Sequence, residues 1–178
     1  MQAQIDGCHA ISNYYELATV DGEVAGLLFG QVKQRFILIG VCQALKRLFL
    51  IFGRFLLGKY GRRRKLLGLI KPCLESWSVL QRNMPVSEAK VVLFAVARRY
   101  QGKGIGRALM DRFVEYALRH KAKSVCVPTD ESASFWFYER YGFTRQAEYL
   151  DPLESYLANK PIKGFIYQLV LDKAEGRE

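Results

Sequence analysis

The fold is decided by a glycine-rich stretch of eight residues, Gln101-Gly102-Lys103-Gly104-Ile105-Gly106-Arg107-Ala108. It follows an apolar, β-branched run over 90–97 that predicts a strand, and it opens an amphipathic helix predicted over 104–120. The first N–H groups of such a helix lack intrahelical partners and carry partial positive charge. Because glycine lets the backbone approach a ligand closely, the stretch predicts a site for a phosphate-bearing molecule.

The spacing of the glycines excludes two common phosphate motifs. The P-loop pattern GxxxxGK[ST] is absent from the sequence. The dinucleotide pattern GxGxxG requires glycine at position 107, where Arg107 stands. At this point the alternative to an anion site is a glycine turn that packs the helix tightly against the strand.

A second informative block follows after one more predicted strand. That strand, over 124–128, is short and apolar and is expected to end at its proline. The block itself reads Ser134-Phe135-Trp136-Phe137-Tyr138-Glu139-Arg140-Tyr141-Gly142-Phe143. It predicts an aromatic-rich helix over 132–141 that is closed by glycine.

Together the two blocks resemble the GNAT N-acetyltransferase superfamily, and the resemblance extends from about Lys90 to Arg145. The first block is similar to the Q/R-x-x-G-x-G/A pyrophosphate motif, which is matched at Gln101, Gly104 and Gly106. The second is similar to the A-x-x-x-Y-x-x-x-G-F helix, which is matched at Ser134 in place of alanine, Tyr138, Gly142 and Phe143. Two blocks in register are far more specific than either block alone.

The resemblance implies an α/β fold with a mixed α+β sheet, the GNAT-like acyl-CoA N-acyltransferase fold, in a single domain over residues 1–178. Asp21-Gly22 is a hairpin turn signal. The strands expected around that turn and near the end of the chain lie over 13–20, 24–32, 144–150 and 164–171.

The chain departs from the family in a long helical insertion, expected over about 33–82, between the third and fourth family strands. Helical periodicity predicts one helix over 36–57 and a second from about 65 to 80, with an exposed basic break at 61–65 between them. Only about a dozen residues precede the first strand, so the insertion is expected to replace the N-terminal helices that usually help to wall the acceptor site.

The family chemistry is direct attack of an acceptor amine on the thioester of acetyl-CoA, which acts as co-substrate, and no metal is expected. The alternative function is a non-catalytic CoA-binding or sensing module attached to an anionic membrane or a partner through the basic insertion. The residues that the resemblance implies for CoA binding are Phe94, Ala95, Val96, Gln101, Gly102, Lys103, Gly104, Ile105, Gly106, Arg107, Ser134, Phe137 and Tyr138.

These residues have different expected tasks. Backbone N–H groups over 101–107 would bind the pyrophosphate, while Lys103 and Arg107 are either charge-assisted contacts or solvated surface bases. The strand before the loop is expected to be bulged and splayed from its neighbour, so that main-chain groups over 94–96 pair with the pantetheine and the thioester carbonyl. The side chains at these three positions are expected to be core.

Proton transfer needs an acid and a base. Tyr138 matches the family's frequent general acid, which would protonate the thiolate, and its alternative is a core tyrosine. Glu88 is the candidate base, although the family carboxylate is commonly nearer the position of Lys90. The other open candidates are Glu16, Glu23 and Glu139.

The charge of the chain is concentrated in one segment. The 178 residues hold 27 Lys and Arg against 17 Asp and Glu, a net charge of +10. No acid occurs over 24–74, whereas eleven bases do, so the rest is close to neutral. Three alternatives are expected for the insertion: a packed helical cap, a membrane-surface element or an anion platform. It could also form the contact of a homodimer. Nucleic acid is the least favoured partner.

The ends and the cysteines predict a cytoplasmic protein. Residues 1–10 contain Asp6 and no apolar run, unlike a secretory signal. Lys46, Arg47 and Arg54 interrupt the most apolar stretch, which argues against a spanning helix. The four cysteines show no CxxC spacing, so neither a zinc knuckle nor a dithiol redox site is indicated.

Overall fold

The computed structural model describes residues 12–33 and 63–171, and the helix expected over 36–57 lies outside these ranges. The chain divides into two compact units. Within the described ranges, the first unit comprises residues 12–33, 86–127 and 169–171. The second unit comprises residues 63–85 and 128–168.

The first unit begins with the predicted hairpin. Strand β1 (Tyr14–Val20) pairs antiparallel with strand β2 (Glu23–Val32). Between them Asp21 has a φ of 51° and Gly22 a φ of 78°. Two successive residues in the left-handed region form the turn whose twist matches that of the flanking strands, and Asp-Gly suits it. The hairpin expected from the sequence is confirmed.

Strand β3 (Ala89–Val96) extends this sheet on the other edge of β2. Its antiparallel register with β2 shifts between Phe29 and Gly30, which face Leu93 and Val91, so that β3 carries one extra residue there. Strand β4 (Ser124–Asp130) pairs with β3 in parallel through Ala89↔Val125 and Lys90↔Cys126. The strand before the glycine loop is therefore bulged, as the family resemblance implies, but the bulge lies between Val91 and Leu93 and not at 94–96.

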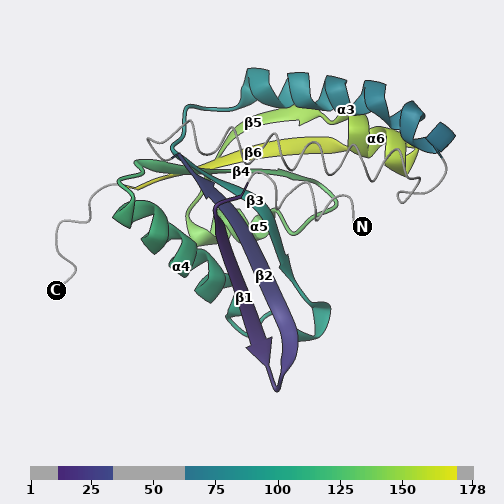
Figure 1. Ribbon diagram of the computed structural model, residues 1–178. Coiled ribbons are helices and arrows are strands. Elements are labelled where there is room, and N and C mark those ends of the chain that lie inside the picture. Colours follow the sequence, from purple (N-terminus) through teal and green to yellow (C-terminus); the bar gives the residue numbers. More distant parts are fainter. Residues whose placement is uncertain (1–11, 34–62, 172–178) are drawn as a thin grey trace. The chain divides into compact units, whose positions relative to one another are not determined.

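Helix α4 (Ile105–Arg119) packs on β1 and β2 (Figure 1). Its inward face is formed by Leu109, Met110, Phe113 and Ala117, all of which are buried. The ring of Phe113 lies against the backbone of Gly30 on β2, where a Cβ atom would collide with it. The close approach of helix and sheet therefore depends on glycine at this position.

The second unit contains the strand pair β5 (Thr144–Leu150) and β6 (Lys163–Val170), which is antiparallel. Helix α5 (Trp136–Tyr141) precedes β5, and helix α6 (Pro152–Ala158) follows it. Helix α3 (Arg63–Asn83) lies beside α6 (Figure 1), and the Ser76 hydroxyl donates a hydrogen bond of 3.0 Å to Asp151 Oδ1.

The strand order is β1-β2-β3-β4-β6-β5, which is a six-stranded mixed sheet. Strands β4 and β6 pair antiparallel: Leu171 N–H donates to the Lys123 carbonyl at 2.7 Å, and Glu131 N–H donates to the Lys163 carbonyl at 2.9 Å. The mixed α/β sheet predicted from the sequence is thus confirmed. Helix α3 accounts for the described end of the expected insertion, and the remainder of the insertion is outside the described residues.

Several element boundaries differ from the prediction. Helix α3 begins at Arg63, inside the expected break, and β4 continues past Pro128 to Asp130. Helix α5 begins at Trp136 and not at 132, because Asp130 accepts hydrogen bonds from the backbone N–H and hydroxyl of Ser132 and holds a turn there. Helix α6 was not predicted at all.

Replacing Gly30 with alanine should destabilise the first unit, because the new methyl group would collide with the fully buried ring of Phe113. We expect the free energy of unfolding in urea to fall by about 1–3 kcal/mol. A smaller side chain at position 113 should relieve the collision. The Gly30→Ala/Phe113→Leu double variant should therefore lose less unfolding free energy than the sum of the losses in the two single variants. Strict additivity of the two losses would contradict the proposed contact.

Candidate functional site

The glycine loop leaves β3 through a short, ordered turn. A 3₁₀ helix over Arg98–Tyr100 follows the strand, and Gln101 N–H donates to the Arg98 carbonyl at 3.3 Å. The Gln101 side-chain amide donates to the carbonyl of Val96 at 3.1 Å. This side chain therefore ties the start of the loop to the end of the strand.

Two glycines give the loop its shape. Gly102 has a φ of 76° and Gly104 a φ of 82°, both in the left-handed region that disfavours other residues. Gly104 is the N-cap of α4, and the first hydrogen bond of the helix runs from Ala108 N–H to its carbonyl at 3.0 Å. The N–H groups of Ile105 and Gly106 precede this first helical bond, and the first turn contains no acidic residue. The loop therefore has the geometry of an anion cradle.

Basic and aromatic side chains surround this loop. The ammonium of Lys103 lies 5.3 Å from the ring centroid of Tyr100, and the guanidinium of Arg99 lies 4.9 Å from it. The Tyr100 hydroxyl donates to Glu23 Oε2 at 3.2 Å, and Arg99 forms an ion pair with the same carboxylate. Arg107 is exposed on the first turn of α4. These groups give the loop a predominantly positive border.

The end of β3 is less buried than predicted. Phe94 and Val96 are half-buried and Ala95 is exposed, so the expectation that all three side chains are core is wrong. The physical reason lies in the pairing of β3. Its backbone register with β2 continues to Val96, whereas its register with β4 covers Ala89 and Lys90.

Glu88 lies just before β3 and contacts the start of β4. Its Oε2 accepts from Lys123 N–H at 3.1 Å and from the Ser124 hydroxyl at 3.3 Å. Burial alone would raise the pKa of Glu88, but the hydrogen bonds from Lys123, from its own backbone and from Ser124 outweigh burial and lower it. The contacts assign Glu88 a structural role, and its role as base stays a prediction.

The other carboxylate candidates are also engaged. Glu16 pairs with Arg112, Glu23 pairs with Arg99, and Glu139 accepts from Arg145 at 2.7 Å. Lys90, at the position where the family carboxylate is common, is half-buried, and burial lowers its pKa.

Tyr138 lies on α5 in the second unit and is 7% exposed. Its ring stacks on Tyr167 with centroids 5.8 Å apart and contacts Phe143 edge-on at 5.7 Å. Burial, followed by the charge of Asp130, raises the pKa of Tyr138 well above its usual value. The phenol is therefore fully protonated at neutral pH.

The remaining predicted residues of this block flank Tyr138. Phe137 is half-buried and meets the ring of Tyr138 edge-on, with centroids 5.5 Å apart. Ser134 is exposed and lies before α5, and its carbonyl accepts from Phe137 N–H at 3.0 Å. Within the described ranges, no cluster of three or more His, Cys, Asp or Glu side chains is arranged to hold a metal ion.

A family model for the acetyltransferase (GNAT) domain matches residues 73–145, which include both sequence blocks. No curated protein matches the chain. Residues 73–145 are therefore similar to a GNAT acetyltransferase domain, in agreement with the resemblance that the two sequence blocks carry.

Solved structures support the same fold. The chain is similar to Ard1 from Thermoplasma volcanium, with 19% identity, a TM-score of 0.56, and 97% of this chain and 81% of that chain covered. It is similar to the ribosomal-protein-S18-alanine N-acetyltransferase of Escherichia coli, with 15% identity, a TM-score of 0.53, and coverage of 97% and 79%. It is also similar to a GNAT family acetyltransferase from Elizabethkingia anophelis with acetyl-CoA bound, with 13% identity, a TM-score of 0.56, and coverage of 96% and 84%.

The contacts of Glu88 generate a pH-dependent prediction for stability. Because its pKa is lower in the folded chain than in the unfolded chain, the ionised carboxylate stabilises the fold above about pH 4.3. This contribution disappears as the pH falls through the folded-state pKa. Glu88→Gln should therefore cost about 0.5 kcal/mol of unfolding free energy at pH 7, and this cost should shrink as the pH falls below about 4.3.

Urea unfolding of both proteins across this pH range measures the difference. A difference between wild type and Glu88→Gln that stays constant from pH 7 to pH 3 would contradict the assigned carboxylate contacts.

Proposed function

We propose that the protein is an N-acetyltransferase that transfers the acetyl group of acetyl-CoA to an amine of a small molecule or protein by direct attack. The observation that carries the proposal is the order of elements in the first unit: a bulged strand, a loop with two left-handed glycines, and a helix N-terminus. These elements lie within the region that the acetyltransferase model matches.

The loop would hold the pyrophosphate of CoA through backbone N–H groups over 101–107. Support comes from the left-handed Gly104 at the N-cap and from the absence of an acid in the first turn of α4. Lys103 and Arg107 are both exposed at this loop and would add charge-assisted contacts to the phosphates.

The end of β3 would hold the pantetheine and polarise the thioester. The short register of β3 with β4 supports this role for main-chain groups over 94–96, because a ladder that ends early leaves room for an extended ligand to pair. A backbone N–H group aimed at the thioester oxygen would stabilise the charge that develops there.

Tyr138 would protonate the thiolate of CoA as it leaves. The phenol is protonated through the neutral and mildly alkaline range, so a proton is available when the thioester breaks, while burial raises its pKa and makes it a weaker acid than a free tyrosine. The sulfur of CoA gains this proton as its bond to the acetyl carbon breaks and the amine nitrogen forms the new bond. Ser134 and Phe137, which flank Tyr138, would complete the binding surface on this block.

The proton lost by the attacking amine would pass to a base directly or through water, and Glu88 is the proposed base. Glu88 is ionised at neutral pH, as a base must be, but the hydrogen bonds that lower its pKa also make it a weaker proton acceptor.

The proposal also covers location and partners. We place the protein in the cytoplasm; in the ranges that the structure describes, no helix is both long and apolar enough to cross a membrane. The basic insertion would contact an anionic membrane or a second copy of the chain. This part is supported by the exposed apolar side chains of Ile70, Leu74 and Trp77, which are spaced one turn apart on α3.

A matched pair of glycine variants tests the cofactor loop. Gly104 and Gly22 both have positive φ, and a Cβ atom at either would meet nothing within 4 Å. Gly104→Ala and Gly22→Ala should each cost about 1 kcal/mol of stability through backbone strain. Titration calorimetry should show that only Gly104→Ala weakens acetyl-CoA binding. The expected loss of affinity is roughly tenfold, which corresponds to losing one hydrogen bond to a charged group. Equal affinities of the two variants for acetyl-CoA would show that the loop is not part of the CoA site.

A second pair of variants tests the acid. Tyr138→Phe should lower kcat by about 100-fold and leave the KM for acetyl-CoA nearly unchanged, because a general acid acts in the transition state. Tyr141→Phe removes a hydroxyl from the same helix and serves as the control with near wild-type turnover. Release of free CoA thiol with a panel of amines measures both.

Unchanged turnover in Tyr138→Phe would exclude the proposed acid. Binding of acetyl-CoA with no turnover by the wild type on any amine would instead favour a non-catalytic CoA-binding module.

A further inference from the structure

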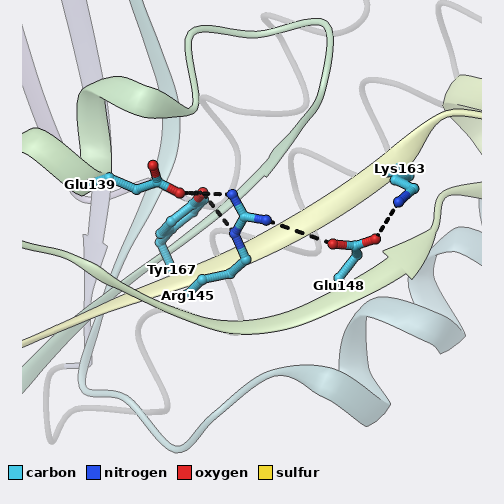
Figure 2. Close-up of polar contacts among 5 residues, drawn as sticks. All are labelled: Glu139, Arg145, Glu148, Lys163 and Tyr167. Atoms are coloured by element: carbon cyan, nitrogen blue, oxygen red, sulfur yellow. Dashed lines mark hydrogen bonds and ion pairs between the residues drawn. The ribbon is translucent and has the colours of Figure 1, made fainter.

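A closed triangle of polar contacts lies beside Tyr138 in the second unit (Figure 2). The Tyr167 hydroxyl donates to Glu139 Oε1 at 2.7 Å, and Arg145 Nη2 donates to the same oxygen at 2.7 Å. Arg145 Nε completes the triangle by donating to the Tyr167 hydroxyl at 3.0 Å. The three residues come from α5, β5 and β6, so the triangle joins the helix to both strands.

The triangle is extended outward by alternating charges. Arg145 Nη1 lies 3.6 Å from Glu148 Oε2, and Lys163 Nζ donates to Glu148 Oε1 at 2.7 Å (Figure 2). The guanidinium of Arg145 also lies 4.3 Å from the ring centroid of Phe165. Arg145 is therefore held by two carboxylates, a hydroxyl and an aromatic face.

The triangle satisfies a buried hydroxyl. Tyr167 is 0% exposed, whereas the side chains of Glu139 and Arg145 are 46% and 36% exposed. The hydroxyl of the buried Tyr167 thus donates to Glu139 and accepts from Arg145, both of which are partly exposed at the surface. Removing either charged partner would leave the hydroxyl of Tyr167 incompletely satisfied and would loosen its ring.

Both ends of the triangle reach Tyr138. Its ring stacks on Tyr167 at an interplanar angle of 30°, and its backbone directly precedes Glu139 on α5. Helix α5 has six residues, too few to be stable without tertiary contacts. The ring and the backbone of Tyr138 are therefore fixed by Tyr167 and Glu139, respectively.

We propose that Glu139, Arg145 and Tyr167 are positioning residues that hold the hydroxyl of Tyr138 in place for proton donation to the leaving thiolate. This inference rests on the proposed function, because it needs Tyr138 to be the acid. Its physical basis is that a proton donor must be held at hydrogen-bond distance from the developing charge, and a misplacement of about 1 Å is costly.

A double-mutant cycle on turnover tests the proposal. Tyr167→Phe keeps the stacked ring and removes the hydroxyl that the triangle holds. We expect it to lower kcat on the order of tenfold with an unchanged KM for acetyl-CoA. In the Tyr138→Phe background the same substitution should have no further effect on kcat, because there is no hydroxyl left to position.

Companion variants keep the test independent of folding. Glu139→Gln changes an exposed carboxylate and should show the same loss of kcat and the same dependence on Tyr138. Arg145→Lys keeps the charge, loses the paired donors, and should fall between Arg145→Met and wild type. Lys163→Gln removes the outer ion pair without touching the triangle and is the matched control with unchanged kcat.

The outcomes separate this inference from the function on which it rests. Equal losses of kcat from Tyr167→Phe in the wild-type and Tyr138→Phe backgrounds would overturn positioning and leave the triangle a structural feature. If Tyr138→Phe alone turns over like the wild type, the proposed acid fails, and the positioning role is overturned with it.

Discussion

The structure of the first unit depends on how β3 is paired. It forms a ladder with β2 along its whole length, but its register with β4 covers only Ala89 and Lys90. Backbone polar groups need partners, so a strand that separates from its neighbour is stable only where something else can pair with it. In the proposed enzyme, that partner is the pantetheine of acetyl-CoA. The half-buried side chains of Phe94 and Val96 near the end of β3 are consistent with this constraint.

The core of the first unit fixes the loop that follows β3. Phe113 packs against Gly30 and seats α4 on β2, while Gln101 ties the loop to the Val96 carbonyl. Gly104 then begins α4 in a left-handed conformation. The N–H groups at the start of α4 are therefore held in place by buried apolar contacts and not by the loop alone, which is the preorganisation that anion binding requires. In the second unit, the side chain of Tyr138 is likewise held in place, by aromatic stacking on Tyr167 and by the triangle of Glu139, Arg145 and Tyr167.

Features with a local signal could be predicted from the sequence. The hairpin follows from Asp21-Gly22, and α4 follows from its apolar periodicity. Helix α6 carried such a signal that was not used: Asp151 caps the helix, and Pro152 stands at its first turn. Other features depend on tertiary contacts that periodicity does not report. The contact of Glu88 with Ser124 spans 36 residues of sequence, and that of Arg145 with Tyr167 spans 22.

The central claim is that acetyl-CoA is held by the backbone of the β3 end and the glycine loop. Hydrogen–deuterium exchange of the full chain with and without acetyl-CoA tests it most directly, because exchange reports the backbone N–H groups themselves. We expect slower exchange over 94–96 and 101–107 when acetyl-CoA is present, and unchanged exchange at the Asp21-Gly22 turn. Binding of acetyl-CoA without slower exchange over 101–107 would contradict it.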